Sequence, residues 1–238
     1  MSSPNIHIFE TSQELASTAA ETFIKQAKGV IEEFGRFTVA LAGGSTPKRA
    51  YEILATQHHD TLDWNKVHAF FGDERTVPPD HEDSNYRMAQ DTLLSHVPIG
   101  SVHRMRGELD PSEAAALYEK DLEVFFGGPP RFDLVLLGIG EDGHTASLFP
   151  GTPALDVRDR WAVENPVEKL GTSRITLTVP AINAATRVVF LVAGEGKAKA
   201  LKEILEVDAE TRDCPAKLIR PVGKLTWMSD AAAASSLS

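Results

Sequence analysis

Hydrophobic and polar positions follow two alternating patterns along the chain. Short, nearly all-apolar runs are typical of strands buried on both faces of a parallel sheet. Between them lie longer segments whose apolar residues recur every three or four positions, which predicts amphipathic helices. We expect strands at residues 5–10, 37–42, 67–72, 132–138, 174–179 and 187–193, with a further short one at 217–219, and helices at residues 12–34, 47–57, after 84, from 111 onward and between 194 and 206.

Cap signals fix several of these boundaries. Thr11 followed three residues later by Glu14 is the capping-box pattern of a helix start, and Gly35 is the residue type that most often ends a helix. Asp110 before Pro111 predicts the start of another helix.

Alternation of short strands with helices predicts an α/β fold with a largely parallel sheet. No internal repeat or polar linker divides the chain, so we expect a single domain over residues 1–230. Residues 150–171 are rich in Pro and Gly and predict a small irregular insertion. Residues 231–238 (AAAASSLS) predict a disordered tail.

The amino-acid composition argues against several classes of protein, namely nucleic-acid-binding, disulfide-stabilised and membrane proteins. Lys and Arg total 24 against 34 Asp and Glu, a formal net charge of −10, which argues against nucleic-acid binding. The single Cys214 excludes a disulfide framework and suits a reducing compartment, so we expect a cytoplasmic protein. No apolar run is long enough to cross a membrane, and no membrane partner is expected.

The first candidate loop follows the strand at 37–42 and reads Gly43, Gly44, Ser45, Thr46, Pro47. Glycines let the backbone approach a ligand closely, and Thr46 can cap a helix that begins at Pro47. The free N–H groups and dipole of that helix start would bind an anion such as phosphate. An ordinary strand–turn–helix connection is the alternative.

The second candidate loop contains Gly138, Gly140 and Gly143, a literal G-x-G-x-x-G after a strand, with Glu164 about twenty residues later. A dinucleotide site needs a long helix directly after the third glycine, and Pro150 follows too soon for one. The turn instead presents Asp142 and His144 at a strand end. A histidine ordinarily titrates near neutrality, so His144 is the candidate general base, although a lone histidine is often structural.

Four further charged residues, near strands of the predicted sheet, are candidates for the site. Asp73 and Arg75 follow the strand at 67–72, and the fork of Arg75 suits an anionic or carbonyl oxygen, although a solvated loop is the alternative. Lys197 lies in the first turn of a helix, where a cation opposes the dipole and an anion would balance it. Arg174 lies on the polar face of its strand. The remaining histidines lack metal-binding spacing, so we expect no metal.

These motifs resemble the glucosamine-6-phosphate isomerase/6-phosphogluconolactonase family over about residues 36–221. The segments that carry the resemblance are ALAGGSTP (40–47), GDERTVPPDHEDSNYR (72–87), LLGIGEDGHTASLFPG (136–151), RITLTVPAIN (174–183) and GEGKA (194–198). The resemblance implies a Rossmann-like α/β fold and hydrolysis of 6-phosphoglucono-δ-lactone to 6-phosphogluconate, in the oxidative pentose phosphate pathway, without a cofactor. The expected partner is a small phosphorylated sugar lactone, and the protein is expected to be a monomer or a small homo-oligomer.

The resemblance also implies residue roles. His144 matches the general base with Asp142 beside it, and Asp73 and Arg75 would line the lactone. The phosphate would be held by Gly43, Gly44, Ser45, Thr46, Arg174 and Lys197. Related deaminases carry an acidic residue five positions after the motif histidine, where this chain has Phe149, which favours the lactonase. A sugar-phosphate isomerase or deaminase, and a sensor that binds a sugar phosphate without turnover, remain the alternatives.

Overall fold

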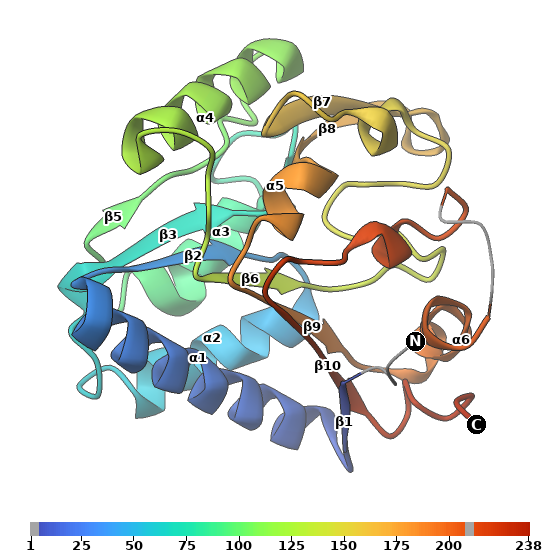
Figure 1. Cartoon of the computed structure of the whole chain (residues 1–238), viewed down its shortest axis with the longest axis horizontal. Helices are drawn as coiled ribbons and strands as arrows, with labels where there is room; N and C mark the ends of the chain where they lie inside the picture. Colours follow the sequence, from blue (N-terminus) through green and yellow to red (C-terminus); the bar gives the residue numbers. More distant parts are fainter. Residues whose placement is uncertain (1–4, 208–211) are drawn as a thin grey trace.

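The computed structural model describes residues 5–207 and 212–238 and contains two sheets (Figure 1). The larger sheet has seven strands in the order β1-β10-β9-β6-β2-β3-β5, and all its pairings are parallel. The predicted parallel α/β architecture is therefore confirmed. The strands are β1 (Ile6–Phe9), β2 (Phe37–Leu41), β3 (Val67–Phe71), β5 (Ser101–Val102), β6 (Leu134–Leu137), β9 (Arg187–Val192) and β10 (Lys224–Asp230).

Helices cover both faces of this sheet. In Figure 1, α1 and α2 run below it, while α4 and the second sheet lie above it. The helices are α1 (Ser12–Phe34), α2 (Ser45–Gln57), α3 (Asn85–Ala89), α4 (Pro111–Phe126), α5 (Val179–Asn183) and α6 (Ala198–Leu205). Short helical turns occur at η1 (Trp64–Lys66), η2 (Gln90–Leu94), η3 (Pro153–Asp156), η4 (Glu168–Leu170), η5 (Glu195–Lys197) and η6 (Pro215–Leu218).

Strand β2 shows why the apolar runs form the central strands of the parallel sheet. Val39 and Leu41 belong to the core between the sheet and helices α1 and α2, and Ala40 belongs to the core on the opposite face of the sheet. Successive side chains of a strand point to opposite faces, so a strand covered on both sides needs apolar residues at every position.

The predicted caps are confirmed at two helices and wrong at a third. Thr11 accepts a hydrogen bond from the Glu14 N–H at 3.1 Å, and Asp110 caps α4. Helix α2, however, begins at Ser45 with Gly44 as its N-cap, and not at Pro47. Gly44 has φ 97° and ψ 168°, a backbone conformation that glycine alone adopts readily. The helix therefore begins directly after Gly44, two residues before the start that a Thr46 cap predicts.

The second sheet corrects one sequence prediction and excludes one alternative. Its strands β4 (Asp73–Arg75), β8 (Thr172–Leu177) and β7 (Ala162–Val167) are antiparallel, so 73–75 is no solvated loop and 150–171 is not wholly irregular. The sequence does not show the alternation of a strand at β7, because one of its inward positions is the fully buried polar residue Asn165. Its amide donates to the Ser147 carbonyl at 2.8 Å and accepts from the Ala154 N–H, so the side chain replaces apolar packing with hydrogen bonds.

The C-terminal region differs from its predictions as well. Residues 217–219 belong to a helical turn and its end, and the last strand is β10, whose buried Thr226, Ser229 and Asp230 hide it from an apolar pattern. Residues 231–238, for which we expected a disordered tail, form turns with a buried Ala233. The Lys202 ammonium donates to the Ser236 carbonyl at 2.7 Å, which ties this segment to α6.

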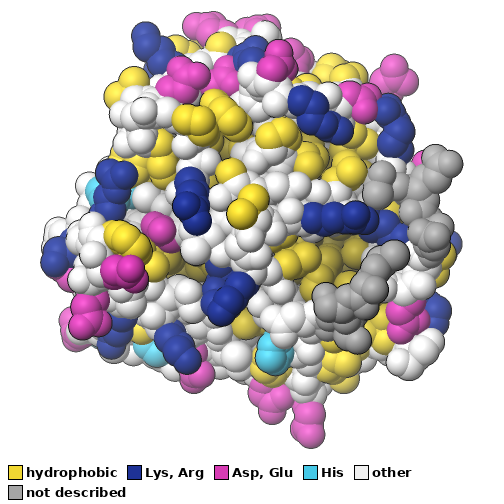
Figure 2. All heavy atoms as spheres, in the orientation of Figure 1, with side chains coloured by type: hydrophobic (Ala, Val, Ile, Leu, Met, Phe, Trp, Pro, Cys, Tyr) yellow, Lys and Arg dark blue, Asp and Glu magenta, His cyan; other side chains and the backbone are white. Residues whose placement is uncertain are grey.

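The surface shows the mixed charge expected from the composition. On the face in Figure 2, basic side chains lie in small separate groups among acidic, polar and hydrophobic ones. No helix among residues 5–207 and 212–238 is long and apolar enough to cross a membrane.

Candidate active site

A cavity of about 580 Å³ opens where β9, β6, β2 and β3 end at their carboxyl ends. These four strands are neighbours in the sheet, so the loops that follow them meet at one edge. Most residues predicted for the site line this cavity, namely Gly43, Gly44, Asp73, Arg75, Asp142, His144, Arg174 and Lys197. Ser45 and Thr46 are not among the lining residues and form the first turn of α2 beside it.

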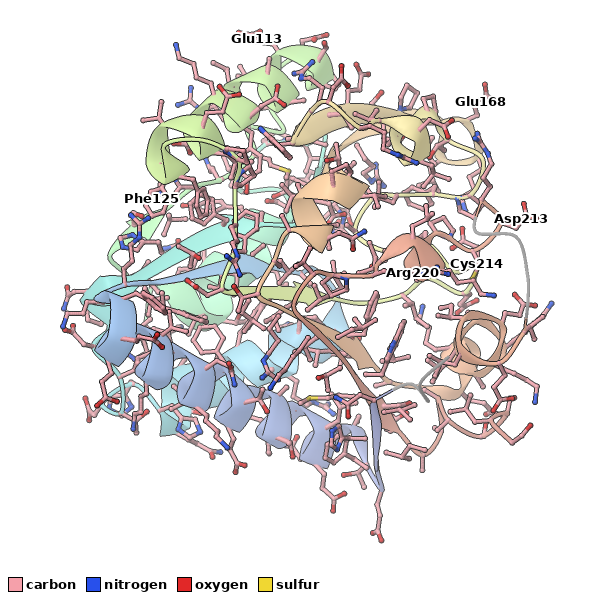
Figure 3. The ribbon with its side chains drawn as sticks, in the orientation of Figure 1. Glu113, Phe125, Glu168, Asp213, Cys214 and Arg220 are labelled. Carbon is pink, nitrogen blue, oxygen red and sulfur yellow. The ribbon has the colours of Figure 1, made fainter. Side chains whose placement is uncertain are left out.

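The glycine turn after β6 holds His144 against its own backbone. The Gly140 N–H donates to the His144 carbonyl at 2.8 Å, and Gly143 closes the turn with φ 77°. A Cβ atom on Gly140 would lie 2.0 Å from His144 Nδ1, which no side chain can tolerate. The Cys214 thiol packs under the same turn, 2.6 Å from where a Gly143 Cβ would lie, and Cys214 is labelled in Figure 3.

The glycines therefore serve the imidazole and not a dinucleotide. Residues 141–152 contain no helix, and Glu164 lies in β7, where it accepts a hydrogen bond from Ser173 Oγ at 2.6 Å. A phosphate group bound in the dinucleotide manner needs the N-terminus of a helix directly after the turn. The disfavoured dinucleotide interpretation is excluded by this geometry.

Asp142 and Phe149 orient the ring of His144. The Asp142 Oδ1 lies 2.5 Å from His144 Nδ1, and the ring centroids of His144 and Phe149 are 4.2 Å apart. Burial would raise the pKa of Asp142, but hydrogen bonds from His144 and Lys169 hold it well below its ordinary value. An ionised Asp142 accepts a hydrogen bond from the Nδ1–H group of His144, which leaves the lone pair of the ring on Nε2, as a general base requires.

Other residues at the cavity are suited to an anion. The first backbone bond of α2 runs from the Lys48 N–H to the Gly44 carbonyl at 3.1 Å, so the N–H groups of Ser45 and Thr46 precede the helical ladder. Lys197 follows Gly194 at the end of β9 and makes no ion pair among the described residues. Free N–H groups at a helix start and an unpaired ammonium are the donors that phosphate prefers.

Two arginines occupy paired positions on neighbouring strands of the second sheet. Arg75 on β4 and Arg174 on β8 are paired in register, and both line the cavity. Burial lowers the pKa of Arg174, and the charge of Arg75 lowers it further. Two like charges held together in a partly buried site are stabilised by a bound anion.

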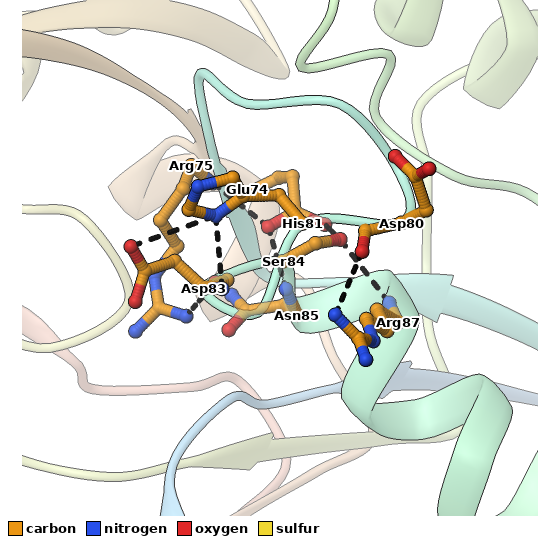
Figure 4. Close-up of polar contacts among 8 residues, drawn as sticks. All are labelled: Glu74, Arg75, Asp80, His81, Asp83, Ser84, Asn85 and Arg87. Carbon is orange, nitrogen blue, oxygen red and sulfur yellow. Dashed lines mark hydrogen bonds and ion pairs between the residues drawn. The ribbon is translucent and has the colours of Figure 1, made fainter.

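Buried Glu74 fixes the segment that runs from β4, which carries Arg75, to α3 (Figure 4). Its carboxylate accepts hydrogen bonds from the backbone N–H groups of Arg75, Asn85 and Tyr86 at 2.7–2.8 Å, and from Ser84 Oγ at 3.1 Å. Burial raises the pKa of Glu74, and these backbone bonds oppose that rise. A single carboxylate thus ties β4 to the start of α3.

Asp73 is held from two sides. Its Oδ2 accepts from Ser147 Oγ at 2.6 Å, and its Oδ1 accepts from the Asn85 amide at 3.0 Å. The Asn85 side chain also occupies the space beside Gly43, where a Cβ would come within 1.9 Å of its Oδ1. Asp73 therefore links the glycine loop after β2 with the segment that follows His144.

Four polar residues that line the cavity were not predicted as site residues, namely Asn85, Glu141, Ser147 and Lys169. Asn85 and Ser147 lie inside the motifs that carry the family resemblance, and that position was the available signal. Lys169 lies in the segment expected to be irregular, and no local pattern points to it. Among the described residues, no group of three or more His, Cys, Asp or Glu side chains is arranged to hold a metal ion.

Comparisons with known proteins identify relatives over nearly the whole chain. Residues 10–227 match the family described as glucosamine-6-phosphate isomerases/6-phosphogluconolactonase. The chain is 45% identical to a 6-phosphogluconolactonase of Synechocystis over 98% of both chains, and 46% identical to one of Nostoc over 95% of this chain and 92% of that one. It resembles the solved 6-phosphogluconolactonase from Trypanosoma cruzi with a TM-score of 0.90 and 31% identity, over 100% of this chain and 98% of that chain.

Proposed function

The chain belongs to the family of glucosamine-6-phosphate isomerases and 6-phosphogluconolactonases, and from that premise we propose that it hydrolyses 6-phosphoglucono-δ-lactone to 6-phosphogluconate with His144 as general base. One observation carries the proposal: His144, held by Asp142, lines the same cavity as Lys197 and Arg174. A base and an anion clamp that share one cavity can act on the two ends of a phosphorylated sugar.

The clamp residues bind the phosphate in this proposal. The phosphate would contact Gly43, Gly44, Arg174 and Lys197, which line the cavity, and the first N–H groups of α2 at Ser45 and Thr46, which lie beside it. Phosphate binding orients the lactone, so binding energy from a group remote from the reaction lowers the barrier. Asp73 and Arg75 line the same cavity, and in this proposal they contact the lactone ring.

His144 Nε2 takes a proton from water as the water oxygen bonds to the lactone carbonyl carbon. Negative charge develops on the carbonyl oxygen, and Arg75 stabilises it. The carbon–oxygen bond to the ring oxygen then breaks, and the imidazolium of His144 returns the proton to that oxygen. General-base action of this kind contributes about 10²–10⁴-fold to the rate.

The deaminase alternative is disfavoured by Phe149. Its ring stacks on His144, with the centroids 4.2 Å apart. A phenyl group transfers no proton, whereas opening a sugar ring requires one to be moved. We further propose that the enzyme acts in the cytoplasm, where its free Cys214 stays reduced, as a monomer or a small homo-oligomer.

The test compares lactone hydrolysis by the wild type and by His144→Ala, with freshly prepared substrate and subtraction of the spontaneous rate. We expect a large loss of kcat, while the affinity for 6-phosphogluconate stays nearly unchanged. Full activity of His144→Ala would refute the base assignment. Release of ammonia from glucosamine 6-phosphate would instead identify a deaminase, and binding without turnover by the wild type would identify a sensor.

A further inference from the structure

A lysine lies at the tip of the hairpin formed by β7 and β8. The last paired residues of the two strands are Val167 and Thr172, so only residues 168–171 connect them. Gly171 adopts φ 61°, which lets the hairpin close tightly. This short connection presents Lys169 at the cavity that His144 lines.

Lys169 contacts both side chains that hold His144. Its ammonium forms an ion pair with Asp142 Oδ2, while the other carboxylate oxygen bonds to His144. The same ammonium lies 4.8 Å from the ring centroid of Phe149, whose ring stacks on the imidazole. Lys169 therefore acts on the imidazole of His144 indirectly, through Asp142 at the edge of the ring and through Phe149 at its face.

The remaining cations of the cavity are arranged differently. Among the described residues, Arg75, Arg174 and Lys197 form no ion pair with a carboxylate, so they are available to an incoming anion. Lys169 already has Asp142 as its partner. Its charge is directed at the base and not at the substrate.

We propose that Lys169 is a positioning residue that shares the Asp142 carboxylate and keeps His144 neutral at lower pH than Asp142 alone would allow. This inference rests on the proposed function. A carboxylate beside an imidazole stabilises the imidazolium, and a base that is already protonated cannot take a proton from water. A cation on the second carboxylate oxygen opposes that stabilisation.

Several other charges line the cavity around the imidazole, and a test must keep them constant. They are Asp73, Arg75, Glu141, Arg174 and Lys197. A substitution at Lys169 leaves all of them in place. The difference between two Lys169 variants therefore reports the charge at this one position.

The experiment measures kcat/KM against pH for the wild type, Lys169→Met, Lys169→Gln and Lys169→Arg. We expect the midpoint of the acid limb to rise by about 0.5–1 pH unit in the Met and Gln variants, as one charge does at a half-exposed site. Lys169→Arg should keep the wild-type profile. Lys66→Met is the matched control, because Lys66 is 48% exposed and pairs with Asp63, while Lys169 is 50% exposed.

An NMR titration of the His144 ring, assigned by the signal missing from His144→Ala, tests the inference independently of activity. The same upward shift is expected in Lys169→Met and Lys169→Gln. If the chain hydrolyses no lactone, the proposed function fails while this titration still decides the role of Lys169. An unmoved midpoint overturns the inference, whether KM stays constant or rises; a raised KM would identify a substrate contact instead.

Discussion

Substitution of Gly140 by alanine tests the placement of the base through a residue that carries no functional group. The new Cβ would lie 2.0 Å from His144 Nδ1, 2.1 Å from Cε1 and 2.6 Å from Asp142 Oδ1. Such contacts are essentially never closer than 3.0 Å, so the imidazole must move by about 1 Å or more. The Asp142–His144 hydrogen bond cannot keep its geometry after that shift.

The size of the effect follows from this displacement. A misplacement of about 1 Å at a reacting group costs roughly 10²-fold in rate, or about 2.7 kcal/mol of barrier. The upper limit is the whole contribution of the base, about 10⁴-fold. We therefore expect kcat of Gly140→Ala to fall by about 10²–10⁴-fold, with little change in the affinity for 6-phosphogluconate.

Gly138→Ala is the matched control. It lies in the same turn, and its Cβ would meet only the Leu191 carbonyl at 3.8 Å, an ordinary contact. We expect near-wild-type hydrolysis, and thermal unfolding should confirm that both variants fold. Because Gly140→Ala acts through the imidazole, the double variant with His144→Ala should be no slower than His144→Ala alone. A Gly140→Ala enzyme with kcat within a few-fold of the wild type would refute the reasoning.

Three further predictions follow from the site. Lys197→Ala and Arg174→Ala should each weaken 6-phosphogluconate binding by about 10–100-fold in calorimetry, because each removes a charged hydrogen bond, while kcat changes less; unchanged binding would remove these residues from the clamp. The free energy of unfolding of Asp142→Asn should depend less on acid pH than that of the wild type. Because the pKa of Asp142 is lower in the fold than its ordinary value of about 3.9, its ionised form stabilises the folded wild type above that pH. This contribution is lost as pH falls towards the pKa of the folded state, so the unfolding free energies of the two proteins should converge below about pH 4. Asn165→Ala should lower the free energy of unfolding by about 2–4 kcal/mol in urea, since it leaves the Ala154 N–H and the Ser147 carbonyl without their partner; a change under 1 kcal/mol would contradict that role.

The family motifs anticipated most of the site because several of them, including both glycine turns and the segment with Lys197, follow the ends of neighbouring parallel strands. Residues such as Gly44, Asp142 and His144 need only their local turn and the rule that parallel strands end at one edge. Lys169 could not be anticipated in this way. It reaches Asp142 through the pairing of β7 with β8, and β7 itself is hidden from an apolar pattern by the buried amide of Asn165.

The sequence by itself determined five strands of the parallel sheet (β1, β2, β3, β6 and β9) and its longer helices, because periodic burial and cap signals act over a few neighbouring residues. It also determined the glycine turns, whose backbone conformations other residues resist. Only the tertiary structure decided which charges meet. The cross-strand pair of Arg75 and Arg174 and the contact of Lys169 with Asp142 join residues far apart in the chain, and electrostatic coupling depends on distance in space and not along the sequence.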